Sequence, residues 1–149
     1  MPFVSVTRLR IRSVRFLPAF ALHTLRATRQ VRAAPGFRGG SILRDRDWTF
    51  WTLTAWDGIG SMRIYMGEGA HRAAMPHLQH WCDEASVVHW EMPEGAPSGD
   101  PLPSWPEADK RMRDSGRTAR VRHPSPHQAT LSYRPPRFGA ATALRPAGP

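Results

Sequence analysis

The chain has 149 residues, enough for one ordinary domain with a buried core and too few for a large two-domain enzyme. Its net charge of +9 arises from 21 basic residues, nearly all of them arginine, against 12 acidic ones. No block of five like charges occurs, and the aromatic residues follow apolar patterns instead of alternating with arginine. These features disfavour nucleic-acid binding.

The single cysteine, Cys82, excludes an internal disulfide framework and favours a reducing compartment. The longest uncharged apolar run near the N-terminus, residues 16–22, contains a proline and is too short for an export signal or a membrane span. We therefore expect a cytoplasmic protein.

Prolines divide the chain near Met92, because eleven of the fifteen lie at or after Pro93. We expect a folded domain over residues 1–92 and a proline-rich, largely irregular extension over residues 93–149. Within the extension, the pattern predicts a linker at 91–105, a short helix at 107–114, an added strand at 117–122 and disorder from residue 134 onward.

Residues 3–12 are rich in β-branched side chains and alternate roughly, which predicts a strand. A helix is expected to follow, with Pro18 in its first turn and apolar residues at steps of three and four up to Val31. Pro35 and Gly36 end it.

Two strands, 37–44 and 48–56, are expected to form a hairpin around the turn at 45–47, with a bulge or a close backbone approach at Gly39 and Gly40. The second strand has bulky side chains on both faces. It is therefore expected to lie centrally, covered on one side and lining a cavity or an interface on the other.

A short helix at 59–66, a longer one at 70–85 interrupted by Pro76, and a last strand at 87–92 complete the pattern. The order βαββ(α)αβ predicts an α+β, ferredoxin-like arrangement with helices on one face of the sheet. The other face must then be covered by a ligand, a tail or a second subunit, and its tryptophans favour a homodimer.

His71 is the foremost candidate for chemistry, because it lies at the start of the longer helix, beside its apolar stripe. There its ring could bind a substrate oxygen, transfer a proton near neutral pH or ligate a haem iron. The alternative is that His71 only braces the start of the helix.

Other reactive side chains give weaker patterns. His77, His80 and Glu84 could share one helix edge, but no second His or Cys cluster completes a metal site, which favours a solvated edge and no metal. His89 and Cys82 are interpreted as packing residues. Motifs for acyl transfer and nucleotide binding are lacking.

Four tryptophans on expected core elements have two compatible interpretations. They form a bulky core and a dimer face, or they line a pocket for a planar or polyene ligand. The four are Trp51, Trp56, Trp81 and Trp90.

The stretch from residue 69 to 85, followed by His89 and Trp90, resembles a bacterial family of the dimeric α/β-barrel superfamily. Residues 15–18 and 50–56 fit the same pattern, so the resemblance covers about residues 3–92. More distantly, the strand order and the His71-Arg72 helix start are similar to spheroidene monooxygenases, which are carotenoid-oxidising haem proteins.

The resemblance implies a ferredoxin-like subunit that pairs face to face with its twin, as in antibiotic-biosynthesis monooxygenases. One hypothesis follows for an enzyme: a monooxygenase-like oxidoreductase acting on an apolar, isoprenoid or polycyclic small molecule. His71 and Arg72 would be its catalytic pair, with Arg72 binding a substrate anion or a propionate, and Trp51, Trp56 and Trp90 would shape the pocket. A haem cofactor and cofactor-free chemistry both stay open.

A second hypothesis is a non-catalytic homodimeric barrel that binds a small apolar ligand. It needs no redox centre, which agrees with the lack of a metal set and of a nucleophile motif.

Overall fold

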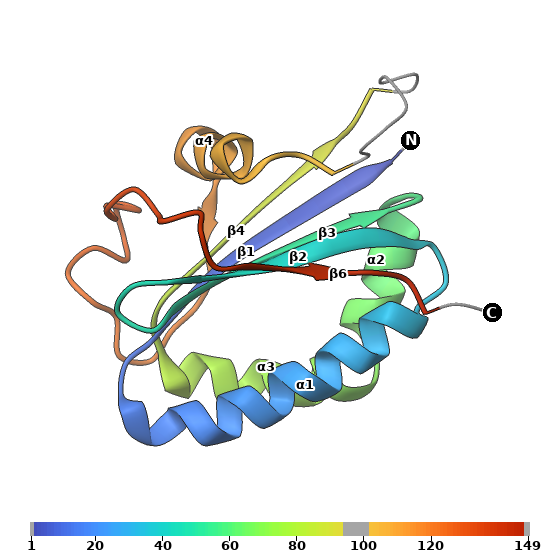
Figure 1. Ribbon diagram of the computed structural model, residues 1–149. Helices are drawn as coiled ribbons and strands as arrows, with labels where there is room; N and C mark the ends of the chain where they lie inside the picture. Colours follow the sequence, from blue (N-terminus) through green and yellow to red (C-terminus); the bar gives the residue numbers. More distant parts are fainter. Residues whose placement is uncertain (1, 94–101, 148–149) are drawn as a thin grey trace.

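The computed structural model describes residues 2–93 and 102–147 (Figure 1). The elements in chain order are β1 (Phe3–Ile11), the short 3-10 helix η1 (Val14–Phe16), α1 (Leu17–Ala33), β2 (Phe37–Asp45), β3 (Thr49–Trp56), α2 (Ile59–Met66), α3 (Gly69–Trp81), β4 (Cys82–Glu91), α4 (Trp105–Ser115), β5 (Arg117–Thr118) and β6 (Ala141–Leu144). The expected α+β class and element order are confirmed. Most of the expected linker, residues 94–101, lies outside the described residues.

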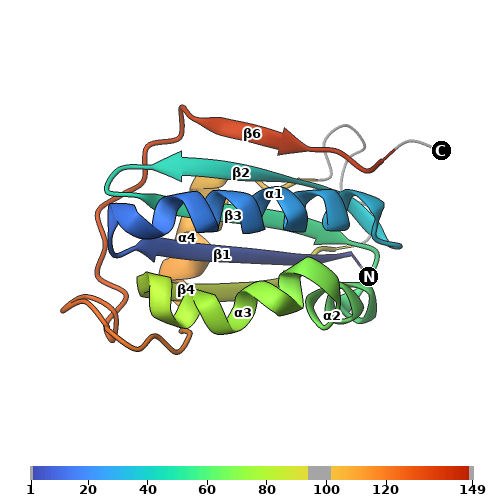
Figure 2. The same ribbon diagram turned by 90° about the horizontal axis from the view of Figure 1, so that it is seen from below.

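The sheet has six strands in the order β5-β4-β1-β3-β2-β6, and every pair of neighbours is antiparallel. Helices α1 and α3 cover one face, and α4 lies against the other (Figures 1 and 2). Four of these strands were expected within residues 1–92. The other two, β5 and β6, come from the C-terminal extension and lie at the two edges. Residues after 134 therefore include a strand where we expected disorder.

Side chains of the central strands alternate between the two faces, as the pleat requires. On β1, Ser5 and Thr7 face the helices, whereas Val4 and Val6 face α4. On β3, the odd-numbered residues from Trp51 to Ala55 face α4. Both faces of these strands are thus covered, as the bulky sequence of β3 predicts.

The face without α1 and α3 is covered by the chain's own extension. Ala108 and Met112 of α4 are fully buried there against an apolar cluster from the sheet. Trp105 and Tyr133 pack beside them. This is the face that the sequence analysis leaves open to a ligand, a tail or a second subunit, and here the tail takes that position.

The longer helix ends four residues earlier than expected, at Trp81, and β4 begins at Cys82 instead of residue 87. Pairing with β1 decides this boundary, because Glu84 lies opposite Arg10 in the register and binds two arginines of β1. These long-range contacts outweigh the local helical preference of Glu84 and Ala85. Glu84 therefore does not share a helix edge with His77 and His80. Pro76 lies inside α3, which continues through it as one helix.

The expected irregularity at Gly39 and Gly40 is present, since the β2–β3 register shifts between Phe37 and Gly39. Gly39 has a φ of +149°. A Cβ atom at Gly40 would overlap the carbonyl oxygen of Leu53 on the neighbouring strand. The backbone of β2 therefore needs a glycine at position 40.

We expect Gly40→Ala to lower the free energy of unfolding by about 1–3 kcal/mol, because β2 must move away from β3. Gly60→Ala is the matched control, because a Cβ atom there meets no atom within 4 Å. Helix propensity predicts that the control gains up to about 1 kcal/mol. Urea unfolding of both variants measures the difference, and equal midpoints would contradict the close approach.

Candidate functional site

A cavity of about 310 Å³ lies between the sheet and the layer formed by α1, α2 and α3. Its volume suits a small organic molecule. The lining is mostly apolar and comes from both layers, including Leu9, Phe20, Val31, Ile42, Phe50, Met62, Met66, Met75, Leu78 and Val87. An apolar ligand is the chemical class that such a lining favours.

His71 and Tyr65 meet at this cavity, where α2 is connected to α3. Their ring centroids are 4.9 Å apart, and both side chains line the cavity. Burial raises the pKa of Tyr65 to about 12, so its hydroxyl stays protonated at neutral pH. Gly69, with a φ of +57°, allows the chain to turn into α3 just before His71.

Gln30 of α1 holds this connection in place. Its amide nitrogen donates to the carbonyl oxygens of Tyr65 (3.1 Å) and Glu68 (2.8 Å). Its amide oxygen accepts from the backbone N–H of His71 (2.9 Å). A single side chain thereby fixes the start of α3 against α1. Sequence reasoning missed Gln30, because its role depends on contacts between distant segments.

The ring of His71 is oriented by a hydrogen bond between Nδ1 and the carbonyl oxygen of Met66 (3.2 Å). A carbonyl oxygen only accepts, so Nδ1 carries the proton in the neutral ring and Nε2 keeps a lone pair. Burial lowers the pKa of His71 and outweighs the opposing effect of the Met66 bond. At neutral pH the imidazole is therefore uncharged and able to accept a proton.

Two further histidines line the cavity. His23 comes from α1, and His89, which also packs against Phe3, comes from β4. Within the described residues, His23 Nδ1 and His89 Nε2 are buried without a hydrogen-bond partner. Burial lowers the pKa of both, with further lowering by His77 near His23 and by Arg117 near His89. Unpaired buried nitrogens of this kind are available to a polar group on a ligand.

The spacing of α1 could have revealed His23. It lies three residues after Phe20 and eight before Val31, on the face that lines the cavity. A histidine among apolar residues at helical spacing is the signal that we overlooked.

Four of the five residues predicted for the site do not line the cavity. Arg72 is exposed, and its side chain makes no hydrogen bond or ion pair within the described residues. Trp51 and Trp90 lie on the opposite sheet face, in the cluster beneath α4. Trp56 is buried beside Phe37 at one end of the helical face. Of the predicted set, the structure places only His71 at the cavity.

Cys82 is fully buried in a cluster with Ile11, Phe20 and Trp81. Burial, together with the neighbouring Asp83, raises the pKa of its thiol to about 12. The thiolate is therefore scarce at neutral pH, which agrees with the packing role inferred from the sequence.

The described residues contain no group of three or more His, Cys, Asp or Glu that could hold a metal ion. For a haem, His71 was predicted as the axial ligand and Arg72 as the partner of a propionate. Arg72 lies outside the cavity, whose lining includes one arginine, Arg120. The structure therefore does not bring the predicted haem-binding pair together at this cavity.

No protein-family model and no curated protein matches this chain. Solved structures do match. Rv0793 from Mycobacterium tuberculosis aligns with a TM-score of 0.57 and 12% identity, over 65% of this chain and all of that one. A candidate antibiotic biosynthesis monooxygenase from Nitrosomonas europaea aligns with a TM-score of 0.54 and 14% identity, over 64% of this chain and 94% of its own.

A variant of SnoaB, a cofactor-independent oxygenase from Streptomyces nogalater, gives a TM-score of 0.51 and 16% identity, over 65% of this chain and 98% of its own. Identities this low show the fold alone. This chain has the ferredoxin-like α+β fold of the antibiotic-biosynthesis-monooxygenase-like proteins, as the resemblance implied. Among the described residues, no helix combines the length and apolar character that crossing a bilayer requires.

The lowered pKa of His71 predicts how stability changes with pH. Below about pH 6.5 the unfolded chain protonates this residue before the folded chain does, so folding becomes less favourable as the pH falls. We expect the loss of unfolding free energy between about pH 7 and pH 5 to be smaller in His71→Gln than in the unaltered protein. Urea unfolding at the two pH values measures it. Equal losses would mean that His71 titrates as a solvated residue.

Proposed function

We propose that this chain is a monooxygenase-like enzyme that oxidises an apolar small molecule in the cavity between the sheet and α1–α3. The observation that carries the proposal is a neutral, oriented histidine in a mostly apolar cavity. The fold that the chain shares with SnoaB, which is described as a cofactor-independent oxygenase, supports the same chemistry.

His71 would act as the base. Its Nε2 atom takes a proton from an acidic C–H or O–H group of the substrate, and the ring then carries the charge. The Met66 carbonyl stabilises this protonated ring through Nδ1. The substrate anion left behind is the electron-rich form that reacts with O₂. Oxidation of an activated methylene to a carbonyl consumes one O₂ and releases one water, so the substrate supplies all the electrons.

The histidines at the other positions of the lining would orient the substrate. His23 and His89 offer unpaired nitrogens, and a hydroxyl or carbonyl group on the substrate could pair with them. A polycyclic molecule with oxygen substituents combines the required apolar area with such groups. This is the substrate class that the lining favours among those considered from the sequence.

Binding without turnover is the second candidate function. It is favoured by the position of Arg72, which leaves His71 without the predicted catalytic partner. The cavity would then hold the same class of apolar molecule. Oxygen consumption separates this function from the first.

A homodimer remains part of the proposal. Because α4 occupies one sheet face and α1–α3 the other, the pairing surface would lie elsewhere. Large apolar side chains are exposed on the helical layer at Leu22, Leu25 and Ile64. These would be the contact residues of a dimer formed through the outer face of the helices.

Filling the cavity should weaken ligand binding. Ala74 is buried and lines the cavity, whereas Ala73, its neighbour on α3, is exposed. We expect Ala74→Trp to weaken binding of the apolar probe N-phenyl-1-naphthylamine by about tenfold or more, and Ala73→Trp to leave it unchanged. Fluorescence titration measures both. Similar affinities in the two variants would place the probe outside this cavity.

The enzymatic proposal predicts that His71 is needed for turnover. With 1,8-dihydroxyanthrone as a probe substrate, we expect the unaltered protein to catalyse oxygen consumption. We expect His71→Ala to lower the rate by about 100-fold or more. His123→Ala is the control, since His123 is exposed on the C-terminal extension and does not line the cavity. An oxygen electrode measures the rates. Probe binding with no oxygen uptake by the unaltered protein would favour the non-catalytic function.

A further inference from the structure

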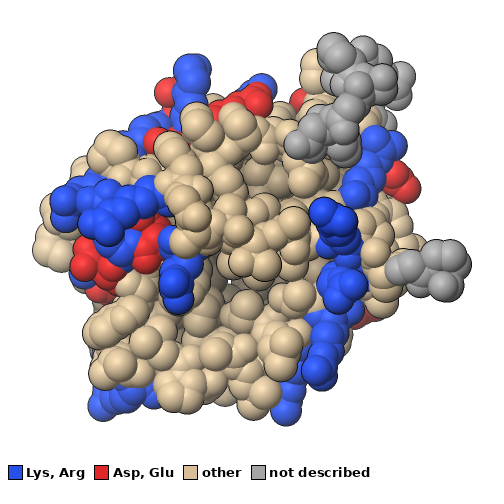
Figure 3. Space-filling model, viewed as in Figure 1, with Lys and Arg blue, Asp and Glu red and all other residues tan. Residues whose placement is uncertain are grey.

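A second cavity, of about 410 Å³, lies at the end of the sheet where β1 and the β2–β3 turn meet the C-terminal loop. It shares no lining residue with the first cavity. Its lining is polar and rich in arginine, and consists of Arg8, Arg10, Asp45, Arg46, Asp47, Thr49, Glu84, Arg113, His127, Ser132, Tyr133 and Arg134. On the face seen in Figure 3, basic and acidic side chains are mixed at this end of the molecule.

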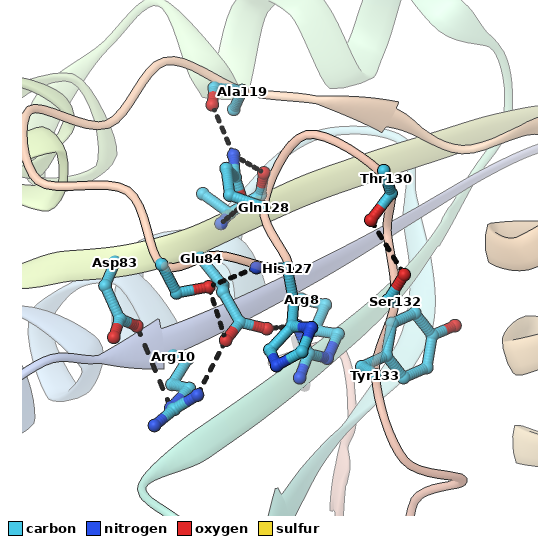
Figure 4. A network of polar contacts seen from close by, with 12 residues as sticks. Arg8, Arg10, Asp83, Glu84, Ala119, His127, Gln128, Thr130, Ser132 and Tyr133 are labelled. Atoms are coloured by element: carbon cyan, nitrogen blue, oxygen red, sulfur yellow. Dashed lines mark hydrogen bonds and ion pairs between the residues drawn. The ribbon is translucent and has the colours of Figure 1, made fainter.

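Glu84 organises the inner wall of this cavity (Figure 4). Its carboxylate accepts hydrogen bonds from Arg8 (2.8 Å), Arg10 (2.7 Å) and the hydroxyl of Ser125 (3.1 Å). The side chains of Glu84 and Arg8 are only 4% and 8% exposed. Burial alone would raise the pKa of Glu84, but these hydrogen bonds outweigh burial and lower it. Glu84 is therefore charged, and both of its carboxylate oxygens accept hydrogen bonds from protein groups.

Tyr133 holds two of the arginines in a fixed orientation. The guanidinium groups of Arg8 and Arg113 lie 4.3 Å and 4.0 Å from the centre of its ring. The tyrosine hydroxyl donates to Asp109 (2.7 Å), which also accepts from Arg113 (3.0 Å). Stacking of this kind restrains a guanidinium plane without using its N–H donors.

Several donors around the cavity have no partner among the described residues. Arg8 Nε and Arg46 Nε are buried and make no hydrogen bond. Arg46 Nε lies 3.8 Å from Asp45, beyond hydrogen-bond distance, and that carboxylate accepts from the backbone N–H of Arg137. Within the described part of the chain, the side chain of Arg134 makes no hydrogen bond or ion pair. Buried unpaired donors are costly, and a ligand that accepts from them removes the cost.

Arginines outnumber carboxylates in the lining itself. It carries five arginines (8, 10, 46, 113 and 134) and three carboxylates (45, 47 and 84), while Asp83 and Asp109, outside the lining, pair with Arg10 and Arg113. An anion with several acceptor oxygens matches the free N–H donors of this lining. Guanidinium groups bind phosphate through paired N–H donors in this way.

We propose that this cavity binds a phosphate group, either as the free anion or as part of a small phosphate ester. Arg134 supplies an unpaired charge. Arg46 is ion-paired with Asp45 and donates through Nη2 to the carbonyl oxygen of Pro135 (3.0 Å), but its Nε atom is left without a hydrogen bond within the described residues. The buried Nε atom of Arg8 supplies a restrained donor at the inner wall. The volume exceeds that of one phosphate, which leaves room for the organic part of an ester. The proposal is independent of any reaction in the first cavity.

Isothermal titration calorimetry of the full chain with inorganic phosphate, at constant ionic strength set by sodium chloride, tests this proposal. We expect saturable binding that is about tenfold weaker in Arg46→Gln and in Arg134→Gln. Arg29→Gln, an exposed position on α1, removes the same charge elsewhere and should leave the affinity unchanged. Two variants are used so that the test survives if one of them unfolds. Arg8 is left unaltered, because its loss would leave Glu84 buried with one partner fewer.

Absence of saturable phosphate binding would overturn the proposal, and so would an equal loss of affinity in all three variants, which would reflect net charge alone. Affinities unaffected by Arg46→Gln and Arg134→Gln would also overturn it, since the anion would then bind elsewhere. Titration with glycerol 3-phosphate separates the two sources of the phosphate group. Tighter binding of the ester assigns the site to esters, and tighter binding of inorganic phosphate assigns it to the free anion.

Discussion

The fold depends on a sheet whose central strands have large side chains on both faces. Adjacent residues of a strand point in opposite directions, so β1 and β3 cannot bury their apolar residues against a single layer. Helices α1–α3 cover the face of Ser5, Thr7 and Phe50, and α4 covers the face of Val4 and Trp51. The layer of α1–α3 and helix α4 pack differently against the sheet. The helical layer leaves an apolar cavity against the sheet, whereas α4 packs closely and the polar cavity opens beyond its edge.

Regular periodicity made much of this architecture predictable. The β-branched residues of β1, the three- and four-residue steps of α1 and the β2–β3 hairpin were all found from local patterns. The start of β4 was not, because Glu84 and Ala85 favour a helix locally and become strand residues through pairing with β1. The position of α4 was equally hidden, since a short helix in a proline-rich segment does not indicate which surface it will cover.

The candidate site was predictable to a smaller extent. His71 could be identified because it follows a glycine at the start of an amphipathic helix. Arg72 was grouped with it by adjacency, but consecutive residues of a helix point about 100° apart, and Arg72 faces the solvent. The bulk of Trp51 was evident from the sequence. The sequence did not show that α4 would cover the face of the sheet on which Trp51 lies. Gln30 depends on three backbone contacts made by distant residues, for which no local pattern exists.

The packing of α4 on the sheet also affects how this protein can change in evolution. Where two identical subunits cover each other, every substitution on the shared face occurs twice, and both copies must tolerate it. Here Trp51 on the sheet and Met112 on α4 are separate positions of one chain. A substitution in α4 can therefore be compensated on the sheet without a symmetry-related duplicate. The core beneath α4 is free to become asymmetric, one pair of contacting residues at a time.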